Sequence, residues 1–262
     1  MIAISDNVQV RKDYPSGTII INRPNRCNAL SREIVAAIQQ GLEDLYQENQ
    51  VRAVILTGTG TAFSSGSDLQ EINETSESQN THQIWHEDVS RFQSLIEYML
   101  RYPKPIICAV NGWVIGSGTA LMLASDITVA SSDAQLKMPE NRHGLFSGVA
   151  AALLAFRIGN GLAAKILLTG ETISSDRCHT LGIYHEQVAN DLLWARCNEI
   201  ACELAKGARQ SHQLVKQMIN ETVGEELFTY LSIGSANTAT ARTTEVAQEG
   251  VKAFLEKRTP NW

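Results

Sequence analysis

The chain has 262 residues, of which 44% are hydrophobic and 19% are charged, and its formal net charge is −6. This length and balance fit one globular α/β domain, with or without a small appendage, and supply enough apolar side chains for a sizeable core. An acidic chain with scattered Lys and Arg residues argues against nucleic acid as the main partner, although a local basic cluster can still hold a small anionic ligand.

The five cysteines contain no C-x-x-C pair, and an odd number fits poorly with a disulfide framework. We therefore expect reduced, mostly buried thiols in a cytoplasmic protein. The first ten residues show no basic patch followed by an apolar run, so no signal peptide is expected. Residues 105–125 carry no charge over a length that could cross a membrane, but Pro, Asn-Gly and Gly-Ser-Gly interrupt them. They predict a buried strand, loop and helix, and no membrane partner.

Strand and helix signals alternate from the start of the chain. Residues 8–11 and 17–22 predict two short strands joined by a turn that contains Pro15. Ser31 is a suitable N-cap for a helix that extends to about residue 48. Apolar side chains recur in this helix at helical spacing and predict one buried face, formed by Ile34, Ile38, Leu42 and Leu45.

The alternation continues to about residue 190. The nearly continuous Val, Ile and Leu residues at 51–57 predict a strand that is covered on both faces. The polar, turn-rich residues 71–81 predict a surface loop, and a helix is expected over 82–101. The remaining expected elements are strands at 106–110 and 127–130, and helices at 149–156, at 162–168 and from 190 nearly to the end.

Two glycine-bearing loops each follow a predicted strand and each open a helix. The first, at 61–69, reads Thr-Ala-Phe-Ser-Ser-Gly-Ser-Asp-Leu, and the second, at 111–120, reads Asn-Gly-Trp-Val-Ile-Gly-Ser-Gly-Thr-Ala. A strand, a glycine turn and a helix start present unbonded backbone N–H groups to a ligand. Two such turns can hold one oxygen between two N–H donors, as an oxyanion hole does. Glu140 follows the second loop and could move a proton.

Other chemistries fit these residues less well. His82 and His86 have metal-ligand spacing, but they lack a recognisable third ligand, so no metal site is predicted. The Gly-Ser-Gly at 116–118 lacks the third glycine and the acidic residue of a dinucleotide fingerprint, and a P-loop is absent. A triad hydrolase is disfavoured because no serine lies in a G-x-S-x-G motif. The serines that could act as the nucleophile of such a hydrolase are Ser64, Ser65, Ser67 and Ser117.

In its motifs and their order, the sequence resembles the crotonase superfamily, the enoyl-CoA hydratases and isomerases, along essentially its whole length. The matching segments are residues 22–31, 62–69, 103–118, 139–140, 168–174 and 249–258. The resemblance implies an α/β fold, a crotonase-like spiral of ββα units with a C-terminal helical region. It implies a spiral core with the ligand site over 1–195 and a helical trimerisation region over 196–262. The assembly implied is a homotrimer or a dimer of trimers.

The resemblance also implies an acyl-CoA thioester as substrate, with coenzyme A as part of that substrate and no separate cofactor or metal. The backbone N–H groups of Ser67 and Ser117 would bind the thioester carbonyl oxygen and favour the enolate. Since these donors are main-chain groups, serine at positions where relatives carry Ala and Gly need not matter. Gly148 would aim a helix N-terminus at the same oxygen.

Further residues match positions that contact coenzyme A in relatives. Arg26 lies where relatives often carry a basic contact, and loop residues would border the adenine and pantetheine. Phe254 and Lys257 match residues that reach coenzyme A from a neighbouring subunit, but a helix core Phe and a solvated Lys are equally good interpretations. The other predicted contacts are Ala29, Ser65, Gly66, Asp68, Leu69 and Gly116.

The sequence departs from the family pattern at Ala120. Hydratases that resemble this chain carry two glutamates; the first falls at Ala120 and the second at Glu140. Adding water to a double bond needs one group to deprotonate water and another to protonate Cα, and Ala120 can do neither. Moving a double bond from the 3- to the 2-position needs a single base. After Glu140, Asn141-Arg142-His143 also replaces the usual apolar residues.

The sequence therefore predicts an enoyl-CoA hydratase/isomerase family enzyme with Glu140 as its single acid/base. Isomerase-like or modified hydratase/dehydratase chemistry is preferred over ordinary two-glutamate hydration. Two further functions stay open. The chain could be an acyl-CoA-binding relative with little catalysis, although a pure binder has no need of Glu140. It could also be a crotonase-type hydrolase, for which His143 is the only hint.

Overall fold

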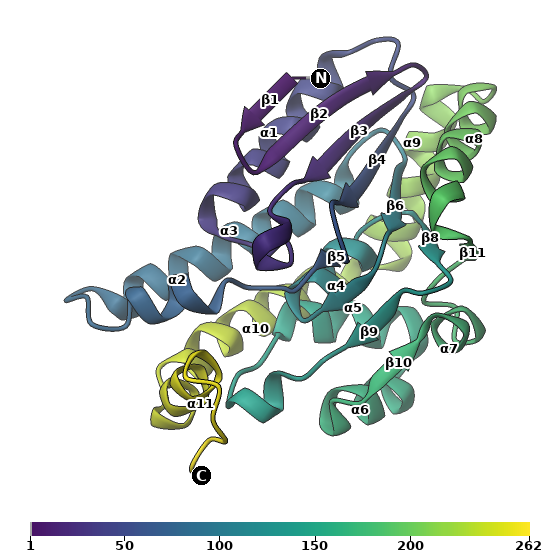
Figure 1. Ribbon diagram of the computed structural model, residues 1–262. Helices are drawn as coiled ribbons and strands as arrows, with labels where there is room; N and C mark the ends of the chain where they lie inside the picture. The colour runs from purple at the N-terminus through teal and green to yellow at the C-terminus, as the bar shows by residue number, and fades with distance from the viewer. Residues whose placement is uncertain (1) are drawn as a thin grey trace.

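The structure, a computed structural model, describes residues 2–262 and is built around a seven-stranded sheet (Figure 1). The strand order is β1 (Ile2–Ser5), β2 (Val8–Asp13), β3 (Ser16–Ile21), β4 (Ala53–Gly58), β6 (Ile106–Val110), β8 (Ile127–Ser131) and β11 (Glu186–Val188). The first three strands pair antiparallel, and the strands from β3 to β11 pair parallel. No sequence pattern predicted β1, which lies at the edge of this sheet.

A second, smaller sheet is made of short strands. Its order is β10 (Thr172–Ser174), β9 (Gln135–Lys137), β7 (Trp113–Ile115) and β5 (Ala62–Ser64). Along the chain, β4, β6 and β8 of the main sheet are each followed directly by β5, β7 and β9 of the small sheet, and then by helical structure. This repeat is the expected spiral of ββα units.

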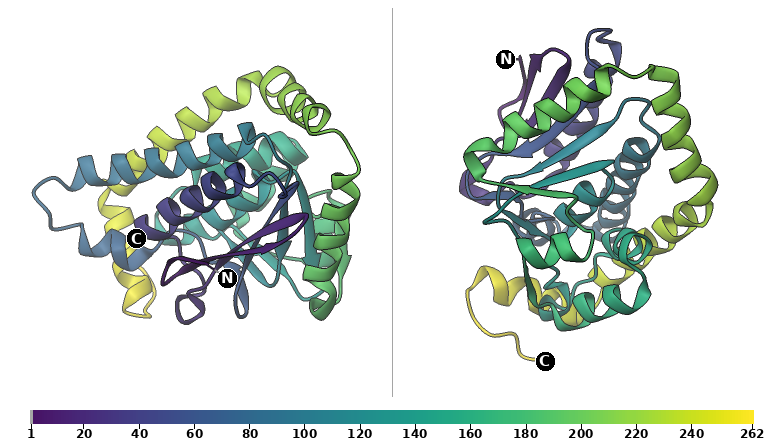
Figure 2. Two further views of the ribbon diagram at one scale, coloured as in Figure 1. Left: turned by 90° about the horizontal axis from the view of Figure 1, so that it is seen from above. Right: turned by 90° about the vertical axis from the view of Figure 1, so that its right-hand side faces the viewer.

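Helices cover the main sheet on both faces (Figure 2). The larger core packs against α1 (Arg32–Gln47), α3 (Thr81–Arg101), α4 (Ser117–Leu123), α5 (Gly148–Ile158) and α10 (Glu225–Arg242). A smaller cluster on the opposite face packs β4, β6 and β8 against α8 (Leu193–Ala205). The boundary expected at 195/196 falls inside α8.

The remaining helices connect these layers or extend from them. They are α2 (Leu69–Glu74), α6 (Asn160–Thr169), α7 (Ser175–Thr180), α9 (Arg209–Gln217), α11 (Glu245–Leu255), the 3-10 turns Pro24–Arg26, Glu140–His143 and Asn190–Leu192, and a π-helical turn at Met218–Val223. Within the described residues, none of the helices combines the length and the apolar character needed to cross a membrane.

Most predicted elements are present within a residue or two. Ser31 caps α1 by accepting a hydrogen bond from the Ile34 amide, and the predicted stripe on α1 is buried. The prediction of a loop over 71–81 is partly wrong, because α2 occupies Leu69–Glu74. Asp68 accepts hydrogen bonds from the Gln70 and Glu71 amides and so starts a helix that apolar periodicity does not reveal.

The C-terminal helices return to the carboxyl ends of the short strands. Figure 1 shows α11, in yellow, beneath α2, and these two helices pack against each other. α11 also packs on the turn Glu140–His143, while α10 packs on α5 and α3. Residues near 140 and 240 are therefore neighbours in space, although they lie far apart in sequence.

Candidate active site

Three short strands bring the two glycine loops and Glu140 to one edge of the small sheet. β5, β7 and β9 are parallel neighbours, with β7 in the middle. β5 and β7 lie inside the two segments predicted as loops, so that prediction is wrong at residues 62–64 and 113–115. The turns at Gly66 and Gly116 follow these strands, and Glu140 lies three residues beyond the end of β9. Because the carboxyl ends of parallel strands share an edge, the topology brings these segments together, at the position where open α/β sheets bind ligands.

Two glycines with positive φ allow the segments to approach closely. Gly66 has φ +82°, and a Cβ there would lie 2.7 Å from the Ile115 carbonyl oxygen and 3.0 Å from the Ser117 nitrogen. Gly116 has φ +54°, and a Cβ there would lie 2.2 Å from Glu140 Oε1. Only glycine therefore fits at the contact between the two loops and at the contact between the second loop and Glu140.

The two predicted oxyanion donors have unengaged main-chain N–H groups. Among the described residues, no hydrogen bond uses the Ser67 or Ser117 amide as its donor, whereas the Asp68 and Gly116 amides beside them are bonded to Leu30 and Lys137 carbonyls. The two side-chain hydroxyls lie 2.9 Å apart and share a hydrogen bond. This hydroxyl pair ties the first loop to the second.

The Glu140 carboxyl group makes one hydrogen bond to another side chain, accepting from the Ser147 hydroxyl at 2.8 Å. Burial raises the pKa of Glu140 above its ordinary value, and the Ser147 hydroxyl only partly opposes that rise. A carboxyl group with a raised pKa is suited to exchanging a proton near neutral pH.

Two cavities meet at this site. The one that we call the Glu140 cavity has a volume of about 560 Å³, and the one that we call the Arg32 cavity has a volume of about 550 Å³. Seven residues line both: Ser67, Asp68, Ile72, Ser117, Ser147, Thr238 and Arg242. The predicted oxyanion donors thus lie at the junction of two chambers, each of a size typical for small-molecule ligands.

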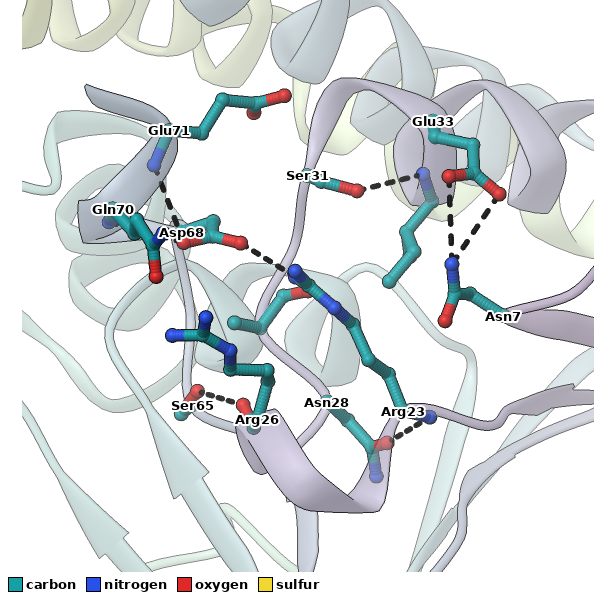
Figure 3. Close-up of polar contacts among 12 residues, drawn as sticks. Asn7, Arg23, Arg26, Asn28, Ser31, Glu33, Ser65, Asp68, Gln70 and Glu71 are labelled. Carbon is teal, nitrogen blue, oxygen red and sulfur yellow. Dashed lines mark hydrogen bonds and ion pairs between the residues drawn. The ribbon is translucent and has the colours of Figure 1, made fainter. Parts of the chain in front are cut away.

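The first loop is held by a polar network around Asp68 (Figure 3). Arg23 forms an ion pair with Asp68, and the Arg23 amide donates to the Asn28 side chain. Burial tends to raise the pKa of Asp68, but the Arg23 ion pair and the α2 amides outweigh it and lower the pKa. Because its carboxylate is engaged in this way, Asp68 holds the loop and is a weak candidate for a direct ligand contact.

Most of the other predicted contact residues line the Glu140 cavity. Arg26 is exposed at its edge, and the Ser65 hydroxyl donates to the Arg26 carbonyl oxygen (Figure 3). Gly66 lines neither cavity, since it is packed against the second loop. The predicted residues on the cavity wall are Arg26, Ala29, Ser65, Leu69, Gly116 and Phe254.

Gly148 lies where α5 meets α10. It lines the Arg32 cavity at the first turn of α5, but its N–H already donates to the Thr238 hydroxyl at 2.9 Å. Its nearest contacts are main-chain atoms of Gly234 on α10. The Gly148 N–H thus joins α5 to α10, while the expected direction of the α5 N-terminus toward the thioester oxygen stays a prediction.

Phe254 reaches the Glu140 cavity of its own chain, because α11 folds back over the site. Its ring meets the His143 ring edge-on at a centroid distance of 5.1 Å. Lys257 is exposed and lines neither cavity. Phe254 thus lines its own chain's cavity, and its expected contact with coenzyme A from a neighbouring subunit stays a prediction.

Position 120 offers no second acid to the site. Ala120 is fully buried in α4 within the main core. His143, by contrast, is half-buried and lines the Glu140 cavity. Burial is the main cause that lowers the pKa of His143, with Lys137 and Arg142 adding to it. The imidazole is therefore biased toward its neutral form.

Sequence reasoning missed three polar residues at the junction: Ser147, Thr238 and Arg242. Ser147 lies in a loop without a motif. Thr238 and Arg242 are one turn apart on α10, about 100 residues after Glu140 in the sequence, and only the return of α10 to α5 brings them to the site. No local motif marks these positions, because burial and helix packing are properties of the folded chain.

A model of the enoyl-CoA hydratase/isomerase family matches residues 17–262. The chain belongs to this family. Its members act on acyl-CoA thioesters, so the enzyme class and the ligand class implied by the sequence are confirmed at that level. The solved structures that resemble the chain belong to the crotonase superfamily, which confirms the predicted fold.

The proteins that resemble this chain in sequence include one named as a hydratase and one named as an isomerase. A Putative enoyl-CoA hydratase from Thermus thermophilus is 31% identical over 255 residues, which cover 97% of this chain and 100% of that protein. The 1,2-epoxyphenylacetyl-CoA isomerase of Escherichia coli is 30% identical over 249 residues, 94% of each chain. A crystal structure of an enoyl-CoA hydratase/isomerase from Pseudoalteromonas atlantica is 30% identical, with a TM-score of 0.85 over 98% of this chain and 100% of that one.

Proposed function

We propose that this protein transfers protons at the Cα atom of an acyl-CoA thioester through an enolate, with Glu140 as its single acid/base. The observation that carries the proposal is the pair of unengaged N–H groups, of Ser67 and Ser117, at the edge of the cavity that holds Glu140. Gly116 brings the second loop directly against the Glu140 carboxyl group.

In the proposed reaction the thioester carbonyl oxygen accepts hydrogen bonds from both amides. When Glu140 removes a proton from Cα, negative charge develops on that oxygen, and the two fixed donors stabilise it. One such donor stabilises the transition state by about 3 kcal/mol. The amides are held in place by the Gly66 and Gly116 contacts, so little reorganisation is needed when the charge forms.

A single acid favours isomerase-like chemistry. In moving a double bond from the 3- to the 2-position, Glu140 would take a proton from Cα and return one to C4. Asp68, the other carboxylate at the junction, is engaged by Arg23 and the α2 amides. Ordinary hydration would need a second free acid. The site also fits a modified hydratase or dehydratase, provided that an uncharged group such as His143 orients the water molecule.

The two cavities suggest where the two arms of the substrate lie. Arg26, Ser65 and Leu69 line the Glu140 cavity, and we assign it to the coenzyme A arm, which enters as part of the substrate. The acyl chain would then extend from the junction into the Arg32 cavity. Proton transfer itself needs no redox partner, so the proposal includes no separate cofactor.

The test uses a 3-enoyl-CoA and, separately, the matching 2-enoyl-CoA. We expect the 3-enoyl thioester to become conjugated at unchanged mass, which ultraviolet absorbance and mass spectrometry detect. Gain of one water by the 2-enoyl thioester with no action on the 3-enoyl thioester would contradict the isomerase assignment and indicate hydration.

The same assay also detects hydrolysis and binding without turnover. Release of free coenzyme A would indicate a hydrolase, for which the supporting observation is that His143, with a lowered pKa, lines the same cavity as Glu140. Measurable binding of both thioesters without any turnover or Cα deuterium exchange in deuterated water would contradict the proposal and leave an acyl-CoA-binding protein.

A further inference from the structure

Arg242 is a buried cation with no bonded partner in the part of the chain that the structure describes. It is 8% exposed at the C-terminal end of α10 and lines both cavities. Among the described residues, its guanidinium group forms no hydrogen bond and no ion pair, and burial lowers the pKa of Arg242 to about 10. Buried charges in proteins are normally paired and hydrogen-bonded, so an unpaired one that faces a cavity indicates a ligand that supplies the partner.

The other charged groups of the Arg32 cavity are already matched. Arg32 donates two hydrogen bonds to Asp88, the second at 2.7 Å, and Arg91 pairs with Glu87 at the exposed edge. Asp68 is paired with Arg23. These pairs leave no free carboxylate among them for Arg242.

Glu71 is the remaining acid of this cavity. One of its carboxyl oxygens accepts a hydrogen bond from the Arg32 amide at 3.1 Å. Burial is the main cause that raises the pKa of Glu71, and Asp88 and Asp68 add to the rise. Glu71 and Asp88 attract Arg242 through space, but among the described residues neither forms a hydrogen bond or ion pair with it. Arg242 therefore remains the cation of the cavity without a bonded anion.

The position of Arg242 fits the acyl arm of a substrate. Thr238, one helical turn earlier, also lines both cavities and is bonded to the Gly148 amide at the start of α5. This contact fixes α10 against the junction where the thioester would lie. The backbone that carries Arg242 is thus held beside the path that leads from the junction into the Arg32 cavity.

We propose that the Arg32 cavity accepts an acyl group that carries a carboxylate, and that Arg242 binds this carboxylate. The inference rests on the proposed function, because it assigns coenzyme A to the Glu140 cavity and the acyl chain to the other. A guanidinium group matches a carboxylate with two parallel hydrogen bonds. The substrate class is therefore a mono-thioester of a dicarboxylic acid.

The experiment compares pairs of 3-enoyl-CoA thioesters of equal chain length, one ending in a methyl group and one in a carboxylate, over several lengths. We expect kcat/KM to favour the carboxylate by about 10- to 100-fold at the best length, as a hydrogen bond to a charged group gives. Arg242→Met should remove this preference, so that kcat/KM falls much more for the carboxylate-ended thioester than for the methyl-ended one. Arg242→Lys should restore part of the preference.

Arg91→Met is the matched control, since Arg91 is 60% exposed at the edge of the same cavity. This variant removes one positive charge without removing the buried donor, so the preference should persist. An equal loss for both thioesters in Arg242→Met would indicate a structural role and contradict the proposal. A kcat/KM ratio near one in the wild-type protein at every length would overturn it without any variant.

Failure of the proposed function can be told apart from failure of this inference. The corresponding saturated thioesters cannot isomerise, and calorimetry gives their dissociation constants without turnover. Tighter binding of the carboxylate form, lost in Arg242→Met, would support the inference even in a protein that turns over neither enoyl thioester. Equal dissociation constants for the two saturated forms would contradict it.

Discussion

At the scale of single residues, the site depends on main-chain geometry as much as on side chains. Gly66 and Gly116 permit contacts that a Cβ atom would block, and these contacts set the distance between two amides and one carboxyl group. The Ser67–Ser117 hydroxyl pair adds a direct link between the loops. Small changes here should therefore affect catalysis more than stability.

Gly116→Ala should lower kcat by about 100-fold, because the new Cβ would displace Glu140 Oε1 and a shift of about 1 Å can have this effect. Gly182→Ala is the control. Gly182 also has positive φ, at +73°, but nothing lies within 4 Å of the added Cβ. Steady-state kinetics on both variants separates the displacement of Glu140 from the effect of backbone strain at a glycine with positive φ. Equal activity of the two variants would contradict the contact between Gly116 and Glu140.

Ser147→Ala should move the acidic limb of the kcat/KM profile to higher pH. The Ser147 hydroxyl stabilises the ionised carboxylate and so lowers the pKa of Glu140. Without it, burial raises that pKa further, and a higher pH is needed to ionise the base. A pH profile of the free enzyme tests this, and an acidic limb that is unchanged or shifted to lower pH would show that Ser147 does not act on Glu140.

The sequence could reveal those parts of the site that lie in short, contiguous motifs. Gly66 and Gly116 lie in glycine-bearing loop motifs and Glu140 lies in a segment that resembles the family, so the sequence could single them out. The short strands β5, β7 and β9, which bring them together, were not predicted. Ser147, by contrast, is defined by a hydrogen bond, and Arg242 by the path of a helix about 100 residues away. Neither property leaves a local pattern, because each depends on tertiary packing.

At the scale of helices and strands, α5 and α10 meet through two glycines. A Cβ on Gly148 would lie 2.1 Å from the Gly234 carbonyl oxygen, and a Cβ on Gly234 would lie 2.5 Å from Gly148 main-chain atoms. This approach lets the Thr238 hydroxyl accept from the Gly148 amide. The contact fixes α10, and with it the side chains that α10 presents to both cavities.

Gly234→Ala should destabilise the protein by about 1–3 kcal/mol, as overpacking does in a tight contact. Gly161→Ala is the control, because Gly161 also lies in a helix and its added Cβ meets nothing within 4 Å. That variant should be neutral or slightly stabilising. Urea unfolding measures both, and a loss of less than about 0.5 kcal/mol in Gly234→Ala would contradict a close helix contact.

Elements with strong periodicity were predictable and short capped ones were not. The apolar stripe of α1 and the apolar runs of β4 and β6 each predict a buried element from the sequence, and the structure confirms that these side chains are buried. α2 has six residues and one buried side chain, and it forms because Asp68 caps it within a network that includes Arg23. Its polar composition predicted a loop, since side-chain capping is visible only once Arg23 and Asp68 are brought together.

At the scale of the whole molecule, apolar side chains gather on α9, the π-helical turn and α10. Those that are 45–73% exposed in the single chain are Leu214, Val215, Met218, Ile219, Val223, Tyr230 and Ile233. Exposed apolar residues in such number indicate a surface that another protein copy covers. Homotrimer formation, implied by the resemblance, stays a prediction, as does a separate helical region over 196–262.

The oligomeric state can be measured directly. We expect a particle of three or six times the chain mass of 28.7 kDa by sedimentation, and Val223→Glu should shift it toward the single chain. The glutamate would place a charge in the apolar interface, where its desolvation is costly. A wild-type protein that sediments as a single chain at micromolar concentration would contradict the predicted assembly.

The central claim is that one carboxyl group, Glu140, moves the proton at a thioester held by two loop amides. It is tested most directly by measuring conversion of a 3-enoyl-CoA to its conjugated isomer by the wild-type protein and by Glu140→Gln. We predict that kcat falls by about 10²- to 10⁴-fold in the variant while the thioester still binds. Full activity in Glu140→Gln, with activity lost in Glu71→Gln instead, would contradict it.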